Sequence, residues 1–401
     1  MTNAYDAIVV GARCAGSPTA MLLARRGYRV LVVDRASFPS DTLSTLLIQP
    51  PGVASLKRWG LLDQVIASNC PPIEQYAFDP GPFVLTGRPQ AHDGIRTAYA
   101  PRRSVLDKIL VDAAAQAGAE VRERFTVEDI VVEDGTVVGI RGHSEGGRSV
   151  VERARVVIGA DGRNSRVARA VEPEHYNDKP VLSHSFYTFW SDLPVDGVTI
   201  RLRDDRAIAS TPTNDGLTLV LVGFPDADAA TFKADVEGNY LSAIDRVPEF
   251  AERVRGAKRE ERFAGGGVAN FLRKPFGPGW ALVGDAGYTK DPITAQGISD
   301  ALRDAELCAT GLDATFNGGS SFDAAMATYQ QTRDEHVLAT YDVTTQLATF
   351  EPPPPEMLEI LAAVHGNQEG MDAFLSVIAG TSSPGQFIEF AQRLLGATEA
   401  A

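Results

Sequence analysis

The stretch "VVGARCAG", residues 9–16, decides the fold class of this chain. It ends the β-rich run "YDAIVV" (5–10) and opens a segment of helix formers that stops at Gly27, a residue typical of helix ends. The apolar run "YRVLVVD" (28–34) follows and is typical of a buried parallel strand. Together these segments predict a βαβ unit that binds a dinucleotide at its glycine turn.

The turn departs from the fingerprint G-x-G-x-x-G at one position, because Arg13 stands where the second glycine belongs. That glycine normally lets the backbone approach a pyrophosphate closely. An arginine has a Cβ, but it also carries a permanent charge and five donors suited to phosphate. We therefore expect Arg13 to keep an allowed backbone conformation and to extend towards the cofactor. Asp34, 18 residues after Gly16, has about the spacing of a carboxylate that binds a ribose hydroxyl.

The bulk composition narrows the class of protein. The chain has 401 residues, 44% of them hydrophobic, and a net charge of −14, which disfavours nucleic acid and anionic membrane surfaces as partners. Three cysteines without a C-x-x-C pair and six histidines without H-E-x-x-H spacing predict neither a disulfide framework nor a metal site. With no apolar run of about 18 residues and no signal-peptide pattern, we expect a cytoplasmic protein without a membrane span.

The remaining segments predict how the chain is organised. A helix is expected over 104–118, a β-hairpin around the Asp134-Gly135 turn, and a buried strand before residue 160. Alternating runs between about 176 and 272 favour antiparallel strands, and "PPPP" at 352–355 precedes a helical tail. We therefore predict an α/β fold (α+β overall) with a Rossmann-like domain over 1–75, 96–175 and 271–350, an inserted antiparallel-sheet substrate domain over 76–95 and 176–270, and a C-terminal helical extension over 351–401.

Two further stretches carry chemistry. "GADGRNSRVAR" (159–169) places an Asp-Gly turn after a strand, and "ALVGDAGYTKDPITAQGISDALRDAE" (281–306) places Gly284-Asp285 after another. The Asp285 carboxylate can accept hydrogen bonds from the hydroxyls of a bound polyol. The N–H groups around Gly297 and Ile298, where a helix is expected to begin, can face an acceptor or a developing negative charge.

These three stretches, in this order, resemble the FAD-dependent monooxygenases of the para-hydroxybenzoate hydroxylase type, relatives of the geranylgeranyl reductases and flavin-dependent halogenases. The resemblance covers about residues 1–170 and 270–345. It implies that FAD is held by Gly11, Arg13, Ala15, Gly16, Asp34, Arg35, Thr45, Leu46, Arg103, Asp161, Gly162, Gly284, Asp285, Pro292, Gln296, Gly297 and Ile298.

The resemblance also implies where each part of the cofactor lies. Gly11 and Gly16 would bracket the pyrophosphate, with Asp34 on the adenosine ribose and Arg35 against the adenine. Arg103 would contact the flavin side of the cofactor, and the Asp161-Gly162 turn would serve both FAD and NAD(P)H. Asp285 would bind the ribityl chain or the pyrophosphate. The segment from Pro292 to Ile298 would lie beside the isoalloxazine ring, with Thr45 and Leu46 at the flavin edge.

The family chemistry implies an activity. NAD(P)H, bound transiently because no second glycine fingerprint is present, reduces the flavin. Oxygen then adds at flavin carbon C4a to give a hydroperoxide, which hydroxylates or epoxidises an aromatic or polycyclic small molecule, as in secondary metabolism. Two alternatives stay open: a flavin-dependent reductase of C=C bonds resembling geranylgeranyl reductases, and a flavin-binding protein without turnover. The W-x-W-x-I-P signature of halogenases is absent, which disfavours halogenation.

Several positions remain undecided by the sequence. Lys290 and Asp291, near the expected flavin, would either tune the ring or contact substrate, or form a solvated loop pair. A strand near 183–191 would carry His184, Tyr187 and Trp190 towards a pocket, with Phe186 and Phe189 on the other face. No catalytic residue is assigned, and the protein is expected to be a monomer or a homodimer.

Overall fold

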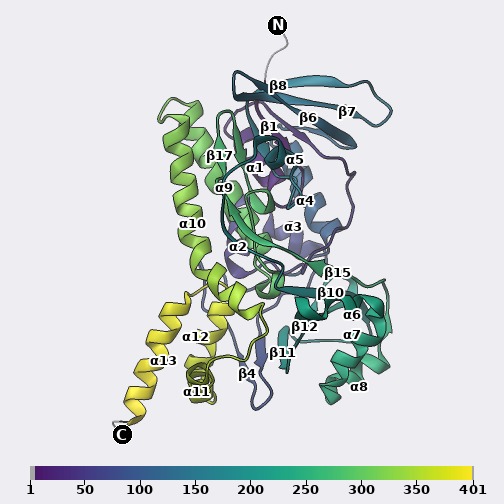
Figure 1. Ribbon diagram of the computed structural model, residues 1–401, viewed down its shortest axis with the longest axis vertical. Coiled ribbons are helices and arrows are strands. Elements are labelled where there is room, and N and C mark those ends of the chain that lie inside the picture. Colours follow the sequence, from purple (N-terminus) through teal and green to yellow (C-terminus); the bar gives the residue numbers. More distant parts are fainter. Residues whose placement is uncertain (1–4, 400–401) are drawn as a thin grey trace.

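The structure, a computed structural model, describes residues 5–399. Residues 1–4 and 400–401, the outermost parts of the first and last predicted segments, lie outside the described residues. The molecule is elongated, with the β6–β7 hairpin near one end and the C-terminal helices at the other (Figure 1).

The first sheet is built around the N-terminal strand. Its main path runs β17-β18-β8-β1-β2-β5, and the pairings from β18 to β5 are parallel. The strands of this path span β1 (Tyr5–Val10), β2 (Val30–Val33), β5 (Glu120–Arg122), β8 (Val150–Gly159), β17 (Phe276–Gly277) and β18 (Trp280–Leu282). Helices cover one face of the β1–β2 region, and the strands formed by residues 125–144 cover the other, so its side chains are buried and its sequence is continuously apolar.

Helices from distant parts of the sequence pack on this sheet. The buried α1 lies against both α4 and α9, and α9 in turn packs on α10 and α2. These helices span α1 (Gly16–Ala24), α2 (Pro50–Trp59), α3 (Leu62–Ala67), α4 (Arg103–Gln116), α5 (Arg166–Val171), α9 (Gly297–Phe316) and α10 (Phe322–Leu347). The predicted hairpin forms from β6 (Phe125–Glu133) and β7 (Thr136–Ser144), with both turn residues, Asp134 and Gly135, at positive φ.

The second sheet supplies the other half of the molecule. Its order is β14-β10-β13-β12-β11-β3-β4, with β15 also paired to β10. The strands are β3 (Tyr76–Asp79), β4 (Leu85–Gly87), β10 (Ser183–Ser191), β11 (Val198–Arg203), β12 (Arg206–Pro212), β13 (Thr218–Pro225), β14 (Lys258–Arg259) and β15 (Ala264–Gly267). A small third sheet is made of β9 (His175–Lys179), β16 (Asn270–Arg273) and β19 (Tyr288–Thr289).

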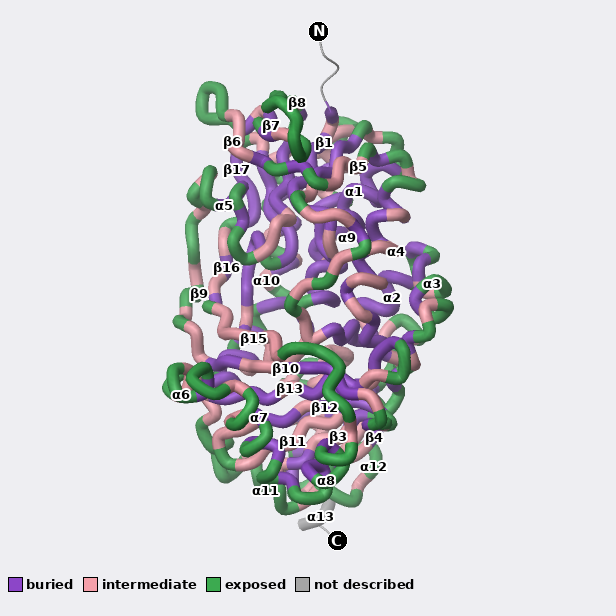
Figure 2. Tube along the Cα trace, turned by 90° about the vertical axis from the view of Figure 1, so that its right-hand side faces the viewer, coloured by how far each residue is buried: buried purple, intermediate pink, exposed green. Residues whose placement is uncertain are grey.

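One part of the second region was not expected from the strand pattern. Between β13 and β14 the chain forms α6 (Ala229–Ala234), α7 (Val236–Asp245) and α8 (Pro248–Gly256). Their apolar side chains pack with one face of the sheet, whereas much of their outer surface is exposed (Figure 2). Phe250, Ala251 and Val254 repeat at helical spacing, which is the sequence signal that indicates α8.

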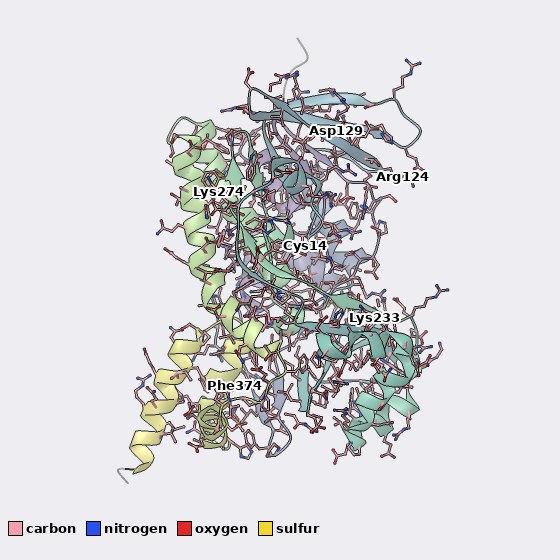
Figure 3. The ribbon with its side chains drawn as sticks, in the orientation of Figure 1. Cys14, Arg124, Asp129, Lys233, Lys274 and Phe374 are labelled. Carbon is pink, nitrogen blue, oxygen red and sulfur yellow. The ribbon has the colours of Figure 1, made fainter. Side chains whose placement is uncertain are left out.

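The tail after residue 351 is helical, as predicted. It comprises α11 (Pro355–Val364), α12 (Gln368–Ile378) and α13 (Pro384–Glu399). The last proline of "PPPP" begins α11, where its missing N–H costs no helical hydrogen bond. Helix α12 packs on β3 and β4, and Phe374 stacks edge-on against Phe78 (Figures 1 and 3). In the described part of the chain no helix is both long and apolar enough to span a bilayer.

Candidate active site

A cavity of about 730 Å³ collects the predicted site residues. It begins at the ends of β1, β2 and β8, passes the start of α9, and reaches the face of the second sheet. Of the seventeen residues predicted to hold a cofactor, all line this cavity except Gly16, which lies behind the turn, and Leu46, which is buried in the neighbouring apolar core. Segments separated by almost 300 residues therefore meet around one space.

The turn after β1 requires its two glycines. Gly11 has a φ of 103°, and a Cβ there would lie 2.4 Å from the carbonyl oxygen of Ala160. A Cβ on Gly16 would lie 1.8 Å from the carbonyl oxygen of Gly11. Arg13 is not among the residues with positive φ, so the third position of the fingerprint accepts a side chain without backbone strain.

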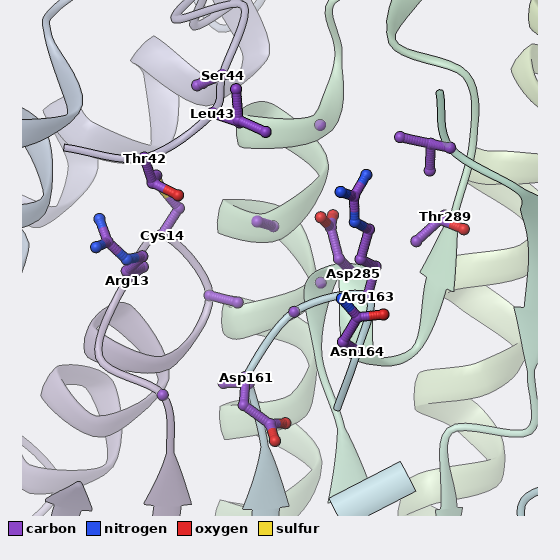
Figure 4. A pocket seen from close by; sticks show the side chains of 18 of the residues that line it. Arg13, Cys14, Thr42, Leu43, Ser44, Asp161, Arg163, Asn164, Asp285 and Thr289 are labelled. Carbon is purple, nitrogen blue, oxygen red and sulfur yellow. The ribbon is translucent and has the colours of Figure 1, made fainter. Parts of the chain in front are cut away.

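The Arg13 side chain lies in the cavity wall. It forms an ion pair with Asp107 of α4, and its Nη2 donates to the Ser40 hydroxyl at 3.1 Å. Asp107 is fully buried and also accepts from Arg103, at 2.9 Å from Nη2. Figure 4 shows Arg13 and Cys14 side by side at the wall of the cavity. Arg13 thus ties the glycine turn to α4 and to the loop at residue 40.

Asp34 braces the same turn from β2. Its Oδ2 accepts from the backbone N–H of Ala12 at 2.7 Å, and its Oδ1 accepts from that of Ala36 at 2.8 Å. Asp34 and Arg35 both line the cavity, at the end remote from the second sheet. The Asp34 side chain can therefore accept hydrogen bonds from the backbone of the turn and still face the ribose of a bound dinucleotide.

The Asp-Gly turn follows β8. Asp161 accepts from the Ser165 hydroxyl and from the backbone N–H of Arg166, at 2.5 and 2.6 Å. Burial raises the pKa of Asp161, and these hydrogen bonds oppose the shift. Gly162 has a φ of 78°, and a Cβ there would meet no atom within 4 Å, so its backbone conformation and not crowding favours glycine.

Asp285 presents an acceptor to the cavity. Within residues 5–399 it has no hydrogen-bond donor or ion-pair partner, and it points into the same space as Arg163 (Figure 4). Burial raises the pKa of Asp285, while Arg103 and Arg163 act in the opposite direction. A carboxylate that is accessible from the cavity and has no donor within residues 5–399 fits a ligand that brings hydroxyl groups, as the ribityl chain of FAD does.

The loop before α9 is held by buried charges. The Lys290 and Asp291 side chains are buried, so the solvated-pair interpretation is wrong: Lys290 packs against α9 and α10, and Asp291 packs against β10. The Lys290 ammonium contacts Asp300 at 2.8 Å, Gln296 at 3.0 Å and Thr340 at 3.3 Å. These contacts fix the loop that leads to Gly297.

Asp291 ties the same loop to the second sheet. Its carboxylate accepts from the Ser183 hydroxyl at 2.6 Å and from the backbone N–H of Ile293 at 3.0 Å. Burial raises the pKa of Asp291, and these donors act in the opposite direction. The start of α9 therefore has a defined position relative to β10.

The second sheet and the segment after β15 also line the cavity, and among their residues only Tyr187 was expected there from the sequence. Ser185, Tyr187, Leu221, Gly265, Gly266 and Val268 line the cavity. The expected facing of β10 was correct for Tyr187 and Phe186 and wrong for His184, Trp190 and Phe189, because strand side chains alternate with period two. Tyr187 lies on the face of Ser185, whereas His184 and Trp190 lie on the opposite face, where Trp190 joins the core under α6–α8. Strict alternation along 183–191 would have separated these two sets.

No metal site accompanies this cavity. Among residues 5–399, no group of three or more His, Cys, Asp or Glu side chains is placed to hold a metal ion. The residues that are present suit FAD: a glycine turn at the buried start of α1, an acceptor at Asp285, and the start of α9.

Comparison with known proteins agrees with this fit. Residues 4–344 match the family described as FAD binding domain. The digeranylgeranylglycerophospholipid reductase of Methanocella arvoryzae is 28% identical over 350 residues, which cover 82% of each chain.

Two solved structures share the fold. The myxobacterial chondrochloren halogenase CndH is 22% identical with a TM-score of 0.79, covering 98% of this chain and 97% of the halogenase. A probable FAD-dependent monooxygenase of Pseudomonas aeruginosa, PqsL, is 21% identical with a TM-score of 0.72, covering 94% and 99%.

Proposed function

The chain belongs to the FAD binding domain family of FAD-dependent oxidoreductases, and we propose that it is a monooxygenase that uses NAD(P)H and O₂ to oxygenate an aromatic or polycyclic small molecule. The observation that carries the proposal is the single cavity in which the glycine turn, Asp285 and the start of α9 meet the face of a second sheet. One end suits the cofactor and the other suits a second small molecule.

FAD, when bound, supplies the acceptor for hydride and the site at which oxygen is activated. The protein residues have separate tasks. Gly11 and the N–H groups at the start of α1 would hold the pyrophosphate, and Asp285 would accept from the ribityl hydroxyls. The N–H groups at Gly297 and Ile298 would face the flavin, where the positive end of α9 favours negative charge. The second sheet would exclude water from the reacting atoms.

A second function is favoured by the curated relatives, several of which are named as digeranylgeranylglycerophospholipid reductases. A reductase of C=C bonds would use the same cofactor cradle. The same cavity of about 730 Å³ serves either function, and the two functions are separated by whether turnover consumes O₂.

The test uses the purified protein loaded with FAD. For an oxygenase, an aromatic substrate stimulates oxygen uptake, and with isotopically labelled O₂ the product carries one labelled oxygen atom. Complete turnover without O₂, with a chemical reductant and a saturated C=C bond in the product, would instead establish the reductase. Stable FAD binding without NAD(P)H oxidation over a broad panel would leave a flavin-binding protein without turnover.

A further inference from the structure

The cavity face of β10 carries two hydroxyl groups. Ser185 and Tyr187 occupy alternate positions on this strand and both line the cavity. They belong to the second sheet, whereas Asp285 follows β18 of the first sheet, and all three residues line the same cavity.

Tyr187 has one hydrogen bond and an unused proton. Its hydroxyl oxygen accepts from the backbone N–H of Ser44 at 3.2 Å, and within the described residues no acceptor takes the phenolic proton. The residue is 8% exposed, and burial raises the pKa of its phenol, with Asp41 adding to the shift and Arg102 and Arg103 opposing it. The group is therefore a neutral donor at physiological pH, and a buried donor of this kind requires an acceptor.

Ser185 is left uncovered by its neighbours. On the two adjacent strands it pairs with Gly223 and Gly266, neither of which has a side chain to shield it. No hydrogen bond of the Ser185 hydroxyl occurs in the part of the chain that the structure describes. A Cβ at Gly266 would meet no atom within 4 Å, so the space beside the serine is open.

The surrounding wall is apolar. The same cavity is lined by Leu43, Leu221, Val268 and Ala295. Leu221 is the residue of β13 that pairs directly with Tyr187 of β10. Two hydroxyl groups within an apolar wall recognise a ligand with one polar edge on an otherwise apolar body.

We propose that Ser185 and Tyr187 determine substrate specificity by hydrogen bonding to one oxygen atom on a flat, apolar ring system. The substrate class is a phenol or a ring ketone, whose oxygen accepts from Tyr187 and from the serine hydroxyl. This inference rests on the proposed function, because it assigns the rest of the cavity to FAD.

A matched pair of probes tests the proposal on the FAD-loaded protein. The probes are 2-naphthol and 2-methylnaphthalene, which have similar shape and differ in the oxygen atom. Binding is measured by the change in the visible absorption of the bound flavin. We expect 2-naphthol to bind about tenfold more tightly, and we expect Tyr187→Phe to remove most of this preference and Ser185→Ala part of it.

Two variants serve as controls. Ser191→Ala removes a hydroxyl of the same strand that bonds to Glu260, and Tyr28→Phe removes one that bonds to Asp313. Both should keep the full preference for 2-naphthol. The inference is overturned if the wild-type protein binds the two probes with equal affinity or binds neither of them. It is also overturned if Tyr187→Phe and Ser185→Ala both keep the full preference for 2-naphthol. Failure to bind FAD would instead defeat the proposed function.

Discussion

At the scale of single residues, Asp107 explains how an arginine fits the glycine turn. The carboxylate is fully buried and pairs with both Arg13 and Arg103, while the Cys14 thiol contacts it at 3.4 Å. Arg13 therefore has a fixed partner within the protein, and the fingerprint keeps its shape although its second glycine is missing.

Substitution of Asp107 tests this pairing. Asp107→Ala leaves two guanidinium groups beside a buried site without their carboxylate, and we expect it to lower the free energy of unfolding by about 3 kcal/mol. Denaturant unfolding measures the loss. The control is Asp112→Ala on the same helix, whose exposed pair with Lys108 contributes about 0.5 kcal/mol or less. Similar losses in the two variants would show that the buried pairing has no special importance.

At the scale of elements, the segment from β19 to α9 is positioned by contacts to three neighbours. Lys290 joins this loop to α9 through Asp300 and to α10 through Thr340, while Asp291 joins it to β10 through Ser183. Ala295 adopts a φ of 49°, which is uncommon for a residue with a Cβ. The start of α9 is therefore held in place by packed elements and not by the loop sequence alone.

Lys290→Met tests this positioning. The substitution removes a buried ammonium group and leaves Asp300 with Arg303 as its remaining ion-pair partner, so we expect a stability loss of about 2 kcal/mol and weaker FAD retention. Thermal unfolding and the FAD content after gel filtration measure the two effects. Lys274→Met, at an exposed site (Figure 3), should change neither. Normal FAD retention by Lys290→Met would show that the loop holds its position without the lysine.

At the scale of the whole molecule, the C-terminal helices form part of the structure beneath the cavity. They lie beyond the residues 4–344 that match the family. Leu375 of α12 is fully buried in the core that also contains Leu46 and Tyr76. Gln49, next to the start of α2, donates to the carbonyl oxygen of Ile378 at 3.4 Å and accepts from the Tyr76 hydroxyl at 2.7 Å.

Deletion of residues 351–401 tests the role of the tail. Because this deletion exposes the core around Leu46 and Tyr76, we expect aggregation and loss of FAD, measured by light scattering and flavin absorption. Leu375→Ala is the milder variant and should cost about 2–5 kcal/mol, whereas Leu358→Ala, at a side chain that is 41% exposed, should cost far less. A deletion variant that keeps FAD and differs from the full chain only in its oligomeric state would indicate that the tail forms a subunit contact.

The sequence was sufficient for the parts of the fold that depend on local patterns. The βαβ unit, the hairpin at Asp134-Gly135 and the helical tail follow from apolar periodicity and turn residues, which act over a few positions. The helices α6–α8 were missed, because strand-like runs on both sides dominated the interpretation of that region. The facing of His184, Trp190 and Phe189 on β10 was wrong because the prediction did not apply a strict period of two along the strand.

By itself, the sequence determined the α/β framework, since strands, helices and glycine turns are local features, and its resemblance to a known family predicted the residues that would hold FAD. The tertiary structure alone decided that Arg13 pairs with Asp107, that the Lys290 and Asp291 side chains are buried, and that Ser185 faces the cavity. The partners in the contacts Lys290–Asp300, Arg13–Asp107 and Ser183–Asp291 are 10, 94 and 108 positions apart. Long-range packing sets such distances, and no local pattern encodes them.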